Sequence, residues 1–75
     1  MKDYEIRETC QNGFTDTWRI RAKNLTSAKR QASRLQVYNN TILSVHELDE
    51  DECFIVAEKG PINWVNSKWR NVVGA

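Results

Sequence analysis

Apolar and polar residues alternate at the start of the chain. Tyr4, Ile6, Glu8 and Cys10 share one parity, and Glu5, Arg7 and Thr9 share the other. This period of two predicts a strand over residues 3–10. The sequence Gln11-Asn12-Gly13 then predicts a tight turn, because asparagine and glycine both tolerate positive φ. Alternation returns over residues 17–23, where Trp18 and Ile20 lie opposite a row of basic side chains, and predicts the second strand of a hairpin.

A helical period follows this hairpin and predicts one helix over residues 26–36. Asn24 and Ser27 offer capping oxygens, and residues 28–37 contain no glycine or proline. At 100° per residue, Ala28, Ala32 and Leu35 fall on one stripe, so we expect all three to be buried. The two alanines are small enough to let the helix lie close to a sheet.

The pattern of the second half of the chain predicts further short strands. Residues 41–48 are rich in β-branched and apolar side chains, residues 49–52 form an acidic turn, and residues 53–57 and 62–65 are short apolar runs. The predicted fold is α+β, a two-layer β-β-α-β-β-β arrangement whose antiparallel sheet curls around one helix. We expect a single domain over residues 1–66, with residues 67–75 as a tail that is a short helical turn or partly disordered.

The composition of the chain argues against an enzyme and against a metal or cofactor site. A chain of 75 residues that is 40% hydrophobic needs nearly all of its apolar residues for one small core, which leaves little room for a catalytic cleft. Cys10 and Cys53 lie within strand patterns, where a reduced cysteine usually packs as a small hydrophobe, and His46 is the one histidine. We therefore expect no metal, no cofactor and no enzymatic activity. The first residues lack an apolar stretch of signal-peptide type, which predicts a cytoplasmic location.

Charge is unevenly distributed along the chain. The net charge is +1, yet residues 17–46 carry six basic and no acidic residues, and residues 47–58 carry six acidic and no basic residues. These segments are either solvated faces or surfaces that steer association with charged partners. For the tryptophans, strand parity predicts that Trp18 and Trp64 lie in the core, and leaves Trp69 as either a cover for a sheet edge or an exposed anchor.

The helix and the segment after it carry a motif. Residues 25–41 read Leu-Thr-Ser-Ala-Lys-Arg-Gln-Ala-Ser-Arg-Leu-Gln-Val-Tyr-Asn-Asn-Thr. The run resembles a family of very small phage anti-CRISPR proteins that inhibit the type I-F surveillance complex. The similarity extends to Tyr4, Gln11-Asn12, Ala22 and Trp64-Val65, and covers roughly residues 1–66. The family fold has the same β-β-α-β-β-β order that periodicity predicts.

The resemblance implies a binding function. Members of the family dock on the repeated backbone subunits of the guide-RNA complex and block target DNA from pairing with the guide. It also implies that Lys29, Arg30 and Arg34 contact double-stranded DNA without sequence specificity. The contact with the protein partner is expected around Gln36, Tyr38 and Asn39, with the acidic 47–58 segment as a further candidate. The alternative left open by the residues is a small phage or mobile-element accessory protein that binds nucleic acid directly.

Overall fold

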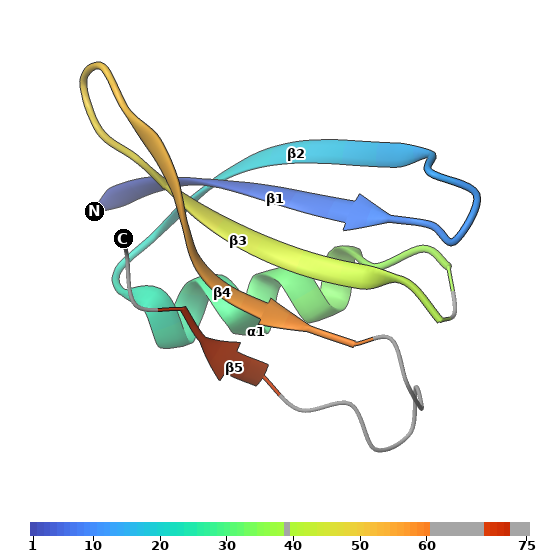
Figure 1. Ribbon diagram of the computed structural model, residues 1–75. Helices are drawn as coiled ribbons and strands as arrows, with labels where there is room; N and C mark the ends of the chain where they lie inside the picture. Colours follow the sequence, from blue (N-terminus) through green and yellow to red (C-terminus); the bar gives the residue numbers. More distant parts are fainter. Residues whose placement is uncertain (39, 61–68, 73–75) are drawn as a thin grey trace.

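The first two strands form the hairpin that alternation predicted. The computed structural model describes residues 1–38, 40–60 and 69–72, arranged as shown in Figure 1. Strand β1 (Lys2–Thr9) pairs antiparallel with β2 (Thr15–Ala22). Gly13 in the connecting turn has a φ of +92°, which glycine adopts without steric cost, and its N–H donates to the Cys10 carbonyl at 2.9 Å.

Helix α1 (Leu25–Leu35) packs on one face of the sheet through its smallest side chains. The Asn24 side chain caps the helix by accepting a hydrogen bond from the Ser27 N–H at 2.9 Å. Ala28 and Ala32 are fully buried, as their spacing predicted. Leu35, the third residue of that stripe, is only half-buried, because it ends the helix and no further turn covers it.

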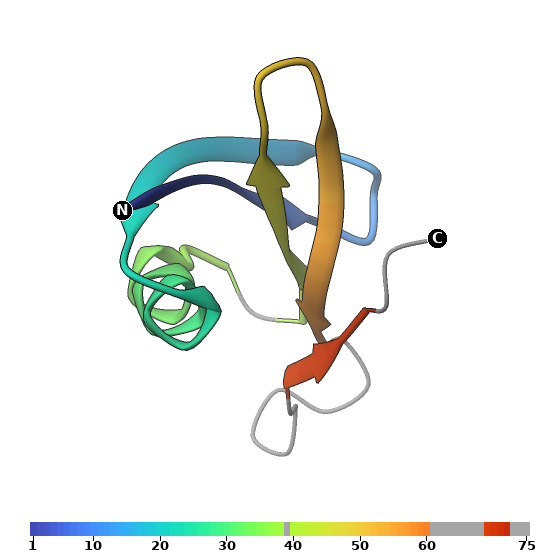
Figure 2. The ribbon, with the colours of Figure 1, turned by 90° about the vertical axis from the view of Figure 1, so that its left-hand side faces the viewer.

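Three further strands complete an antiparallel sheet. Strand β3 (Ile42–Leu48) lies between β1 and β4 (Cys53–Lys59), and β4 pairs with β5 (Trp69–Asn71), giving the order β2-β1-β3-β4-β5. The fold is α+β with element order β-β-α-β-β-β, as the sequence predicted. The view along α1 in Figure 2 shows the sheet curving over the helix, with the β3–β4 hairpin projecting beyond it.

The two faces of the sheet differ in character. The face that packs on α1, called here the helix face, contributes most of the core. The buried apolar residues are Tyr4, Ile6, Ala22, Ala28, Ala32, Leu43, Val45 and Ala57. The opposite face, called here the outer face, carries alternate residues such as Glu5 and Arg7 of β1 and Arg19 and Arg21 of β2. Trp18 belongs to the helix face and packs half-buried against the core.

The C-terminal part differs from the expectation. Residues 69–71 form an edge strand rather than a helical turn or a disordered tail, so the sheet continues beyond residue 66. A segment of three residues is too short to show any period, and its conformation is set by pairing with β4. The strand expected over residues 62–65, together with Trp64, lies outside the described residues. Helix α1 is the helix of the described residues, and it is too short and too polar to cross a membrane.

The cysteines also differ from the expectation. Cys53 was expected in the core but is exposed at the start of β4, and Cys10 is half-buried just after β1. Both are free thiols. A register shift between Val45 and His46 explains the position of Cys53, because beyond the shift the residues of β4 that share the outer face with His46 include Ile55 and Cys53.

Candidate functional site

Helix α1 carries a cationic surface on the side away from the core. Among its residues there is no acidic side chain, and Arg30 and Arg34 are exposed one turn apart. Lys29 is half-buried and turns toward β5, where its Nζ donates to Asn71 Oδ1. The three basic residues predicted for DNA contact therefore lie on one helix, with Arg30 and Arg34 the more accessible.

Lys59 of β4 adds a charge beside this surface that the sequence did not indicate. Its Nζ donates to Ser33 Oγ at 3.1 Å, which places the ammonium group against α1. Burial lowers the pKa of Lys59. Its register partner Leu43 is a core residue, so strand parity puts Lys59 on the helix face. The alternation of residues along β4 could have placed Lys59 on the helix face. Only the packed structure shows that its side chain contacts α1 at Ser33.

The basic row predicted on β2 is balanced in part by acidic residues on β1. Arg21 lies opposite Asp3 and donates to its Oδ1 at 3.0 Å. Arg19 lies opposite Glu5 in the same ladder. These arginines occupy the outer face, whereas α1 covers the other side of the sheet. The two basic regions of the sequence thus do not merge into one cationic surface.

The loop after α1 exposes two large apolar side chains. Val37 is 64% exposed and Tyr38 is 45% exposed. Two more exposed apolar residues, Phe14 and Ile42, lie at the same end of the sheet. Thr9 at the end of β1 pairs with Ile42 on one side and with Thr15, the residue after Phe14, on the other. Exposed apolar side chains gathered at one end of a small domain are typical of a protein-binding surface.

Gln36 belongs to this loop but points its amide inward. Its Nε2 donates to the Tyr38 carbonyl at 3.0 Å and to Thr41 Oγ1 at 3.1 Å. Its Oε1 is buried, with no hydrogen-bond partner among the described residues. Asn39, the third residue predicted for partner contact, lies outside the described residues.

A buried carboxylate that sequence reasoning missed holds the same loop. Glu8 is 0% exposed and accepts hydrogen bonds from the N–H groups of Val37 and Tyr38, each at 3.0 Å, and from Thr41 Oγ1 at 2.7 Å. The sequence held a signal, since Glu8 shares the parity of Tyr4 and Ile6. A glutamate in the apolar row of a strand needs internal donors.

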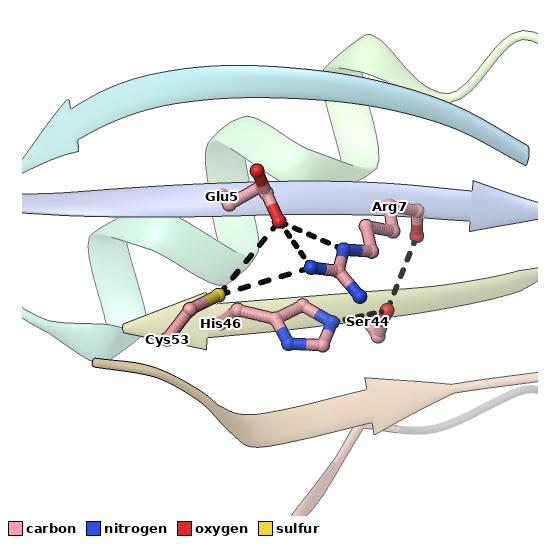
Figure 3. A network of polar contacts seen from close by, with 5 residues as sticks. All are labelled: Glu5, Arg7, Ser44, His46 and Cys53. Atoms are coloured by element: carbon pink, nitrogen blue, oxygen red, sulfur yellow. Dashed lines mark hydrogen bonds and ion pairs between the residues drawn. The ribbon is translucent and has the colours of Figure 1, made fainter. Parts of the chain in front are cut away.

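A second polar network crosses the outer face of the sheet (Figure 3). Arg7 Nη2 lies 2.6 Å from Glu5 Oε2, and its Nε donates to the same oxygen at 2.8 Å. The Cys53 thiol lies 3.8 Å from both partners. His46 Nε2 lies 2.9 Å from Ser44 Oγ. These contacts tie β1, β3 and β4 together.

The electrostatics of this network favour a structural role. The hydrogen bond from Arg7 lowers the pKa of Glu5, while burial and the Arg7 charge lower the pKa of His46. Near neutral pH the carboxylate is therefore ionised and the imidazole neutral. Ser44 and His46 have the spacing of a nucleophile and its base, but Ser44 is buried and its hydroxyl is directed toward the Arg7 carbonyl at 3.5 Å. We interpret the network as cross-strand support for the sheet.

The acidic segment forms the tip of the β3–β4 hairpin. Asp49 and Glu52 close the turn by two backbone hydrogen bonds, and the side chains of residues 49–52 are exposed. Within the described part of the chain, no cluster of three or more histidine, cysteine or acidic residues could hold a metal ion. At the base of the hairpin, Glu47 pairs with Lys2 at 2.9 Å, and this exposed pair raises the pKa of Lys2.

Comparison of the chain with protein-family models, with curated proteins and with solved structures found no match.

Proposed function

We propose that this chain is an anti-CRISPR protein. It is a non-enzymatic inhibitor that binds the backbone subunits of a type I CRISPR surveillance complex and blocks pairing of target DNA with the guide RNA. The resemblance of residues 25–41 to phage inhibitors of the type I-F complex supports the proposal, as does the β-β-α-β-β-β fold. Its site of action is the cytoplasm of the bacterial host, and the activity requires no cofactor or metal ion.

The observation that carries the proposal is the position of the α1–β3 loop. Exposed Val37 and Tyr38 follow directly on a helix that has exposed Arg30 and Arg34 and no acidic side chain. An apolar surface and a cationic surface thus adjoin along one segment of the chain. The apolar end suits docking on a protein subunit, and the helix suits the DNA drawn to the inhibited complex.

Capture of a purified type I-F surveillance complex tests the proposal. We expect stoichiometric binding in the absence of DNA. Tyr38→Ala should weaken binding by about thirtyfold if this aromatic side chain is a hot spot. Phe54→Ala is the comparison variant, because Phe54 is a similarly exposed aromatic residue within the acidic 47–58 segment, the further candidate for partner contact. A loss confined to Tyr38→Ala would assign docking to the α1–β3 loop, and a loss in Phe54→Ala would assign part of it to the acidic segment. Failure of the wild-type protein to bind would contradict the proposal.

Direct binding of nucleic acid by the isolated protein is the second candidate function. The cationic side of α1 favours it. The outer face of the sheet disfavours it, because Asp3 pairs with Arg21 and Glu5 pairs with Arg7, which reduces the net positive charge offered to phosphate groups. DNA binding of equal affinity with and without the surveillance complex would support this second function over the first.

A further inference from the structure

The hydrogen bonds around Glu8 have a fixed direction. The Thr41 hydroxyl donates to Glu8 Oε2 across their 2.7 Å separation, and the backbone N–H groups of Val37 and Tyr38 donate to the same side chain. The lone pairs of that hydroxyl are then free to accept from Gln36 Nε2 at 3.1 Å. The second N–H of the same amide donates to the Tyr38 carbonyl. The carboxylate on β1 thereby sets the orientation of the Gln36 side chain.

This arrangement leaves Gln36 with little to offer a partner. Both of its amide donors are used inside the loop, and its acceptor oxygen is buried. By contrast, the side chains of Val37 and Tyr38 are exposed, while their backbone N–H groups donate to Glu8. The polar groups of the loop face inward and its apolar groups face outward.

We propose that Glu8, Thr41 and Gln36 are positioning residues that fix the backbone at Val37 and Tyr38 so that these two side chains dock on the partner. Gln36 then contributes to docking by holding the loop in place and not by direct contact with the partner. The docking role of Val37 and Tyr38 rests on the proposed function, whereas the positioning of the loop by Glu8, Thr41 and Gln36 does not. The conformation of the loop is testable in the isolated protein.

Amide hydrogen exchange of the isolated protein provides the first test. Thr41→Val removes the hydroxyl at nearly constant shape, and Thr41→Ser retains it. Glu8→Gln replaces one acceptor oxygen with an NH2 donor, and in either orientation of the amide this donor faces the N–H of Val37 or of Tyr38. Since each variant leaves buried polar groups of this network without a hydrogen-bond partner, we expect exchange at Val37 and Tyr38 to accelerate by about tenfold or more in Thr41→Val and in Glu8→Gln. Thr41→Ser should resemble the wild type, and the Ala32 amide in α1 should not change.

Binding to the surveillance complex provides the second test. We expect Thr41→Val to weaken docking by about tenfold and Thr41→Ser to restore it. Gln36→Met removes both donors, and as a positioning residue it should accelerate exchange at Tyr38 and weaken docking together. Its effect should be less than additive with that of Thr41→Val, because the two residues share one chain of hydrogen bonds.

The possible outcomes separate the two proposals. Unchanged exchange at Val37 and Tyr38 in both Thr41→Val and Glu8→Gln would overturn the positioning role, whatever the docking result. Weaker docking by Gln36→Met with unchanged exchange would show direct contact instead. Faster exchange at Val37 and Tyr38 with undiminished docking would show that the hydrogen bonds fix the loop but do not contribute to docking, and would overturn the proposed role in binding. Failure of the wild-type protein to dock would overturn the proposed function, and the exchange data would still decide whether Glu8 fixes the loop. If Glu8→Gln does not fold, Thr41→Val carries the test.

Discussion

The Lys59 ammonium group lies 5.4 Å from the centre of the Trp69 ring, and these two residues are register partners that align β4 with β5. Trp69 also packs half-buried against the core. A cation over an indole ring contributes about 0.5–1 kcal/mol at an accessible site. Of the two roles left open for Trp69 by the sequence, the structure supports the cover for a sheet edge.

Removal of the Trp69 ring should destabilise the fold. Truncation of a fully buried aromatic residue costs about 3–5 kcal/mol, so we expect Trp69→Ala to lower the free energy of unfolding by roughly half of that. Arg70→Ala is the control on the same strand, because its pair with Glu58 is exposed and contributes about 0–1 kcal/mol. Urea unfolding measures both variants. Equal losses would mean that β5 is held by backbone pairing and not by the indole ring.

Two leucines should differ in their contribution to stability. Leu43 on β3 is 0% exposed, whereas Leu35 at the end of α1 is half-buried. We expect Leu43→Ala to cost about 2–5 kcal/mol and Leu35→Ala less than half as much, because the second truncation leaves no enclosed cavity. Thermal unfolding of the two variants side by side checks the order. A larger loss at Leu35 would contradict the packing described for α1.

The sequence was sufficient to predict the elements from β1 to β4, because each depends on local periodicity and on a recognisable turn or cap. Asn24 and Gly13 are examples, since their roles follow from their own chemistry. Strand β5 was missed because its three residues gain their conformation from β4. The loop network was missed because its members are 28 residues apart or more along the chain from Glu8, and only the fold brings the carboxylate to Thr41 and Gln36.

Stability should fall when the pH drops below the ordinary pKa of histidine. Burial lowers the pKa of His46 below its unfolded value of 6.5, so on acidification the unfolded chain takes up a proton before the folded chain does. The free energy of unfolding is therefore expected to decrease from about pH 6.5 downward until the folded pKa is passed. Urea unfolding at about pH 7.5 and 5.5 should show this decrease in the wild type and a smaller one in His46→Gln. The lowered pKa of Glu5 acts only below its ordinary value of 4.5, outside this window. An identical decrease in both proteins would assign the effect to other groups.

Removal of the helix charges should separate DNA recruitment from docking. The triple variant Lys29→Ala, Arg30→Ala, Arg34→Ala spares the buried stripe of α1, and its main structural loss is the hydrogen bond from Lys29 to Asn71. If the three residues contact phosphates, the log–log salt slope of DNA affinity is about −2.7, which is a roughly fortyfold loss between about 50 and 200 mM salt. The triple variant should lose this dependence, while docking on the surveillance complex persists because it depends on apolar contacts at Val37 and Tyr38.

The matched control for this variant is the double change Arg19→Ala, Arg21→Ala on β2. It also removes positive charge, but from the outer face, which lies on the side of the sheet opposite α1 and where Asp3 pairs with Arg21, so we expect little change in DNA recruitment. Affinity for a duplex of random sequence, measured with the complex present at several salt concentrations, compares the two variants. If both variants lower DNA recruitment in proportion to the charge removed, long-range electrostatic attraction is sufficient to explain recruitment, and α1 is not a dedicated DNA-binding surface. If the triple variant recruits DNA as well as the parent, its basic residues only solvate the helix.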